Sequence, residues 1–108
     1  MLGVVEYDLK NRSGVDSWEL AREYTRVIRR KYPERNCRLL NSPTLGSNKL
    51  WGVLEAKSLA DWEQWWKLWG QDEEYKKLEA LRRQKEKESG GRALWTWRLH
   101  IFNEVPID

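Results

Sequence analysis

Apolar and polar side chains alternate in the first segment of the chain, which predicts a β-strand over residues 2–9. Glu6 and Asp8 separate the apolar members, so the two kinds of side chain point to opposite faces of a sheet. The apolar members are Val5, Tyr7 and Leu9.

The spacing of apolar residues then becomes that of a helix. Asp16 is suited to cap this helix, because Glu19 follows three residues later as in a capping box. Pro33 ends it, because proline cannot continue the helical hydrogen-bond ladder. The residues at helical spacing on its apolar side are Trp18, Ala21, Thr25 and Ile28.

Two strands are predicted next, at residues 37–42 and 49–56, with a turn over 43–48 between them. A second helix begins at the capping residue Ser58 and breaks at residues 70–72.

The helix resumes at Asp72 and ends at residues 89–91, where two glycines allow the left-handed conformation that closes helices. Residues 93–102 form the last predicted strand. In the resumed segment, the side chains expected to face water are Glu73, Glu74, Lys76, Lys77 and Glu79.

The resulting order is β-α-β-β-α-β, which predicts one α+β domain over residues 1–108. Right-handed crossovers place two helices on one face of a four-stranded antiparallel sheet. We therefore expect the ferredoxin-like fold.

Strand alternation divides the side chains of the sheet between two faces. The apolar face, expected under the helices, comprises Val5, Tyr7, Leu9, Leu50, Gly52, Leu54, Ala56, Trp95, Trp97, Leu99 and Ile101. The other face mixes charges with the large apolar residues Val4, Trp51, Val53, Leu94 and Phe102. Such a patch predicts an interaction surface, and a second copy of the sheet is its simplest partner. The alternative is a monomer with scattered surface hydrophobic residues.

Composition narrows the choice of partners and compartment. The net charge is +3, but acidic and basic residues are interspersed, so no nucleic acid is expected to bind. Cys37 is the only cysteine, which fits a reducing intracellular compartment. The chain begins without signal-peptide features and contains no apolar stretch of membrane-spanning length. We expect a soluble, cytoplasmic protein with no membrane association.

Candidate catalytic residues gather on the mixed face. His100 and Arg98 lie on the last predicted strand, while Glu6 and Glu55 on other strands face the same way. A carboxylate beside a histidine that titrates near neutrality predicts a general base. The alternative is a structural network of ion pairs.

Aromatic residues are the candidate ligand-binding groups. The chain has eight tryptophans, and Trp62, Trp66 and Trp69 form a stripe at helical spacing with Trp65 beside it. Such a stripe either fills the core or lines a pocket for a planar organic molecule. The candidate ligand contacts are Trp51, Trp66, Trp97 and Tyr7. No metal site and no nucleotide-binding glycine loop is expected, because one histidine and one cysteine cannot form the usual clusters.

Two stretches of sequence resemble the dimeric α/β-barrel superfamily. They are the strand-to-helix junction at residues 51–63 (WGVLEAKSLADWE) and the aromatic helix that breaks and resumes at residues 72–75 (DEEY). The NIPSNAP-like, stress-responsive-barrel and antibiotic-biosynthesis-monooxygenase-like branches are the ones it resembles. The resemblance implies that two sheets close into a barrel with the helices outside.

Members of that superfamily include cofactor-independent monooxygenases, isomerases, haem-binding enzymes and proteins without known activity, so the fold alone does not select a function. Its haem-degrading members use a histidine on a helix with an asparagine and a tryptophan, for which Asn11 and Trp66 are loose matches. No predicted helix here carries a histidine, and we expect no cofactor.

These observations predict a dimer that binds or transforms a small apolar or aromatic molecule without a metal or nucleotide cofactor, in the manner of a monooxygenase or isomerase. The alternative is a non-catalytic dimer whose mixed face is only an interface. The sequence leaves open whether the protein is an enzyme.

Overall fold

Four strands form one antiparallel sheet in the computed structural model, which describes residues 1–10, 14–44 and 46–107. Their order across the sheet is β2-β3-β1-β4, so β1 and β3 are central. The strands are β1 (Leu2–Leu9), β2 (Arg38–Ser42), β3 (Gly46–Glu55) and β4 (Trp95–Phe102).

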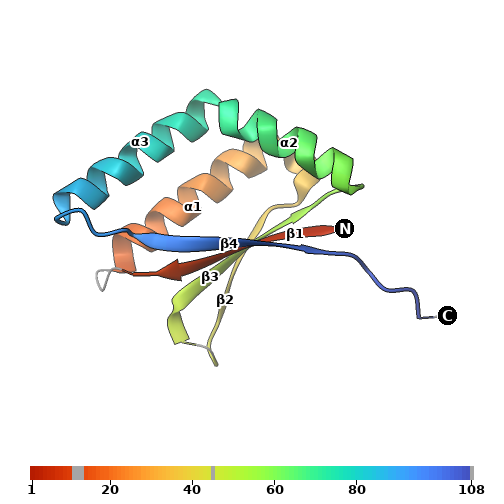
Figure 1. The fold of residues 1–108 in the computed structure, drawn as a ribbon, viewed down its shortest axis with the longest axis horizontal. Coiled ribbons are helices and arrows are strands. Elements are labelled where there is room, and N and C mark those ends of the chain that lie inside the picture. The colour runs from red at the N-terminus through yellow and green to blue at the C-terminus, as the bar shows by residue number, and fades with distance from the viewer. Residues whose placement is uncertain (11–13, 45, 108) are drawn as a thin grey trace.

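The α-helices of the described residues all lie on the same face of this sheet, and the other face is bare (Figure 1). They are α1 (Gly14–Lys31), α2 (Leu59–Gln71) and α3 (Glu73–Glu88), with a short 3₁₀ helix, η1 (Pro33–Arg35), after α1. The predicted α+β architecture is confirmed, and it is compatible with a ferredoxin-like fold.

Local signals set most element boundaries as expected. Ser58 accepts a hydrogen bond from the Asp61 backbone at 3.1 Å, and Asp72 caps α3 by accepting one from the Glu74 backbone at 2.9 Å. The expected starts of α1 and β3 were wrong. Helix α1 begins at Gly14, which places Asp16 in its first turn rather than at the cap. Strand β3 begins inside the expected turn, because its pairing with β2 extends to Gly46.

The core lies between the sheet and the helices, and one glycine sets how closely they approach. A Cβ on Gly3 would lie 2.4 Å from Cζ3 of Trp62, whose side chain is buried. The backbone of β1 therefore touches the indole of α2 directly. The tryptophans buried in this core are Trp62, Trp65, Trp69 and Trp95.

Three residues of the last strand region differ from the expected pattern. Leu94 was expected on the mixed face but is fully buried. It precedes β4, and its backbone N–H donates a hydrogen bond to the Glu86 carboxylate at 2.9 Å. Trp97 and Leu99 are on the helix side as expected, but they are not covered: Trp97 is 51 % exposed and Leu99 is 36 % exposed. Strand β4 is an edge strand, and the helices leave this part of it open.

Candidate functional site

Glu6 is the centre of the charged cluster on the bare face of the sheet. Its cross-strand neighbours are Trp51 on β3 and Arg98 on β4. Its carboxylate lies 3.9 Å from Nζ of Lys49 and 4.0 Å from Nε2 of His100. The structure thus brings Glu6, Arg98 and His100 to adjacent positions, although the His100 contact is longer than a hydrogen bond.

Glu55 does not join this cluster. It pairs in register with Leu2, at the opposite end of β1 from Asp8. Its carboxylate accepts a hydrogen bond from Asn36 at 3.2 Å and lies 3.9 Å from Arg38. Glu55 therefore belongs to a separate ion pair at the β2 side of the sheet.

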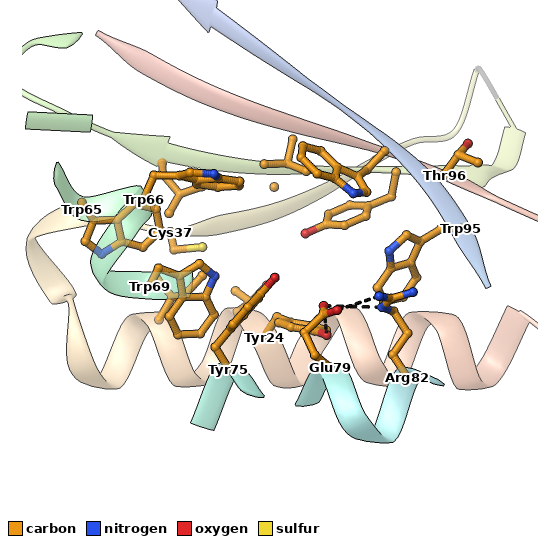
Figure 2. A pocket seen from close by; sticks show the side chains of 17 residues that line it. Tyr24, Cys37, Trp65, Trp66, Trp69, Tyr75, Glu79, Arg82, Trp95 and Thr96 are labelled. Carbon is orange, nitrogen blue, oxygen red and sulfur yellow. Dashed lines mark hydrogen bonds and ion pairs between the residues drawn. The ribbon is translucent and has the colours of Figure 1, made fainter. Parts of the chain in front are cut away.

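A cavity of about 420 Å³ lies on the other side of the sheet, beneath the helices (Figure 2). Its floor includes Gly52 of β3, which leaves room because it has no side chain. The tryptophans that line it are Trp65, Trp66, Trp69, Trp95 and Trp97. Of the predicted ligand contacts, Trp66, Trp97 and Tyr7 line this cavity, whereas Trp51 lies on the bare face.

The aromatic rings form a connected wall around the cavity. Trp66 and Trp97 are 6.1 Å apart between ring centroids and link α2 to β4. Tyr7 meets Trp95 edge to face at 5.2 Å, and Tyr24 meets the same indole at 6.1 Å. Because Trp97 is half exposed, the cavity opens to solvent beside β4.

One end of the cavity carries a charged group supplied by α3. Arg82 donates to both carboxylate oxygens of Glu79, at 2.6 and 3.4 Å, and to Glu86 at 2.9 Å. The Tyr24 hydroxyl of α1 donates to Glu79 at 2.7 Å. Figure 2 shows Glu79, Arg82 and Tyr24 joined in this way.

These contacts fix the charge state of the group. Burial alone would raise the pKa of Glu79, but the hydrogen bonds from Arg82 and Tyr24 outweigh it and lower that pKa. The same bond to Glu79 raises the pKa of Arg82. Glu79 and Arg82 therefore remain an ion pair at neutral pH, and Glu79 is a weak base.

Two more tyrosines and the thiol also face the cavity. Burial raises the pKa of Tyr7 and of Tyr75, so both phenols stay protonated. Burial likewise raises the pKa of Cys37 to about 11, against the opposing effects of Arg29 and of a hydrogen bond with Thr25. A protonated thiol is a poor nucleophile. The lining is thus suited to binding through aromatic contact and phenol hydrogen bonds.

The polar end of the cavity was missed in the sequence. Glu79 was expected to face water, but it is half-buried because Tyr24 and Arg82 enclose it. The signal was present as a stripe at helical spacing on α3, formed by Tyr75, Glu79, Arg82 and Glu86. Asn11, the loose haem-site match, lies outside the described residues.

No protein family, curated protein or solved structure matches this chain. Among the residues that the structure describes, no helix has both the length and the apolar character needed to cross a membrane.

Proposed function

We propose that this protein binds a small, neutral, largely aromatic organic molecule in the cavity between the helices and the sheet. The observation that carries the proposal is the cavity itself, about 420 Å³ and walled by indole and phenol rings. Pockets for small organic ligands range from about 300 to 1,000 Å³ and are mostly apolar with few polar groups.

The charges around the cavity favour a neutral ligand. Glu79 and Arg82 are the charged residues in the described lining, and they pair with each other. Arg82 also pairs with Glu86, so an anionic ligand finds no unpaired cation in that lining. Burying an unpaired charge is costly, so a neutral molecule is preferred.

A matched pair of fluorescent probes tests this proposal. N-phenylnaphthylamine is neutral, and anilinonaphthalene sulfonate adds a sulfonate to the same skeleton. We expect the neutral probe to bind saturably with one site per chain and the sulfonate to bind at least tenfold more weakly. Equal binding of both would contradict the charge argument, and no saturable binding of the neutral probe would overturn the function.

The bare face of the sheet supports a second part of the proposal, a homodimer formed sheet against sheet. This face carries the exposed Leu40, paired in register with the half-buried Trp51, and the exposed Phe102 at the far end of β4. The bare face carries both acidic and basic side chains, among them Glu6 and Arg98. In a two-fold symmetric dimer, Glu6 of one copy can therefore face Arg98 of the other. In such a dimer the Glu6–Arg98–His100 cluster is enclosed, which is where the predicted acid–base role of His100 would apply.

Charge introduced at the exposed apolar residues tests the dimer without disturbing the core. Phe102→Glu and Leu40→Glu should yield a monomer in light scattering, because each buries a carboxylate in the interface. Leu68→Glu is the matched control, since Leu68 is 58 % exposed on α2 and lies away from the bare face. A wild-type monomer, or a dimer that persists in Phe102→Glu and Leu40→Glu together, would contradict the interface.

The alternative function is a non-catalytic dimer that binds no small molecule. A dimer in light scattering that does not bind N-phenylnaphthylamine would support this alternative.

A further inference from the structure

Two phenol hydroxyls in the cavity find no acceptor among the residues that the structure describes, and this sets them apart from the other two tyrosines. Tyr24 donates to Glu79 at 2.7 Å, and Tyr32 donates to Asp72 at 3.2 Å. Tyr7 and Tyr75 line the cavity, but neither hydroxyl donates a hydrogen bond to any described residue.

The two hydroxyls come from opposite walls. Tyr7 lies on the central strand β1 and packs against Trp95. Its Cε2 atom would lie 3.7 Å from a Cβ placed on Gly52. Tyr75 comes from the first turn of α3, with its ring 5.1 Å from Trp69 and its hydroxyl directed towards the sheet (Figure 2). Tyr7, Tyr75 and Glu79 all line the same cavity.

Both hydroxyls act as donors in this setting. Their raised pKa values keep the protons in place, and a phenol is a better donor than acceptor. The nearest carboxylate, Glu79, already accepts from Tyr24 and Arg82. A ligand that fills the cavity shields both hydroxyls from solvent, so it must itself supply their acceptor to avoid leaving a polar group unpaired.

Resting on the proposed binding function, we infer that the cavity selects neutral aromatic molecules that carry an acceptor oxygen, such as a ketone carbonyl, held by the hydroxyls of Tyr7 and Tyr75. The rings of the cavity wall supply apolar contact that any flat hydrocarbon would share. The hydroxyls supply the discrimination, because a hydrocarbon leaves both donors unpaired.

Indane and its ketone, indanone, form a matched ligand pair, because they share one bicyclic skeleton and differ by the carbonyl. Calorimetric titration of the 108-residue chain should show indanone binding at least about fivefold more tightly than indane, the factor expected of one hydrogen bond. The carbonyl stretch of bound indanone should move to lower wavenumber than in an apolar solvent.

The variants Tyr7→Phe and Tyr75→Phe keep the rings and remove the hydroxyls. Together they should abolish the preference for indanone and the infrared shift while indane affinity stays within twofold. Tyr32→Phe is the control, because its hydroxyl bonds to Asp72, and it should keep the preference.

The outcomes separate the two proposals. Equal affinity of the wild-type protein for indane and indanone, or a preference that survives in the double variant, overturns the acceptor-oxygen inference and leaves the cavity as a binding site. Binding of neither ligand overturns the binding function and the inference with it.

Discussion

Replacing Gly3 by alanine should destabilise the protein through a single contact. An added Cβ would lie 2.4, 2.5 and 2.9 Å from Cζ3, Cη2 and Cε3 of Trp62. Carbon atoms pack at about 3.5–4.0 Å, so the indole must move by roughly 1 Å. Trp62 is 2 % exposed and packs against Trp65 and Trp66, which leaves it little freedom to move.

The size of the effect follows from two opposing terms. Overpacking a core costs about 1–3 kcal/mol. Alanine in place of glycine recovers about 0.5–1 kcal/mol by restricting the unfolded chain. The middle of these two ranges gives a net loss of about 1 kcal/mol, and the Tm should fall by roughly 4–8 °C for a domain of this size.

Thermal and urea unfolding, followed by circular dichroism, measure this change. Gly70→Ala is the matched control, because a Cβ there has nothing within 4 Å and the residue is helical. That variant should be neutral or more stable by up to about 1 kcal/mol. In a Trp62→Leu background the cost of Gly3→Ala should shrink by about 1 kcal/mol or more. An unchanged Tm in Gly3→Ala, or the same cost in both backgrounds, refutes the proposed contact.

Two further predictions concern ionisable groups around the cavity. Glu79→Gln should be less stable than wild type at pH 7 by about 1–3 kcal/mol, the value of hydrogen bonds to a charged group. Because the folded-state pKa of Glu79 is lowered, this advantage of the wild type exists above the ordinary glutamate pKa of about 4.3 and is lost as the pH falls through the folded-state pKa. Urea unfolding at pH 7 and pH 3 should therefore show a smaller gap at pH 3, and a constant gap would contradict the assignment. Cys37 is 3 % exposed with its pKa raised to about 11, so a disulfide reagent at pH 8 should label the folded protein orders of magnitude more slowly than the urea-unfolded one. Comparable rates in both states would show that the thiol is accessible.

The two faces of the sheet were predictable from the sequence because strand alternation is a local property. Val5, Tyr7, Leu50 and Leu54 all face the helices, as the alternation of side chains along a strand indicated. Leu94 broke the pattern because alternation holds only within a strand, and β4 begins one residue later.

The cavity depends on the placement of whole helices, which residue patterns do not report. The tryptophan stripe predicted either a core or a pocket wall, and its members do both. Trp62 is buried in the core, whereas Trp66 is partly buried and lines the cavity. Glu79 was misplaced because a charged residue on a polar helix usually faces water. Its partner Tyr24 is 55 residues away in the chain, which no local pattern connects to it.

The candidate acid–base residues show the same division. Register brings Glu6, Arg98 and His100 together, as strand alternation indicated. Glu55 lies on the same face but pairs with Leu2 rather than with Glu6, too far along β1 to join the cluster. Strand alternation predicts which face a side chain lies on, but it does not predict which residues pair across neighbouring strands.

Filling the cavity tests the central claim most directly. Gly52→Leu places a branched side chain in the cavity floor, whereas Gly70→Leu makes the same change where nothing lies within 4 Å. Titration with neutral N-phenylnaphthylamine should give saturable binding to the wild type and to Gly70→Leu, with at least a tenfold loss of affinity in a folded Gly52→Leu variant. Undiminished binding to folded Gly52→Leu would place the probe elsewhere and contradict the account.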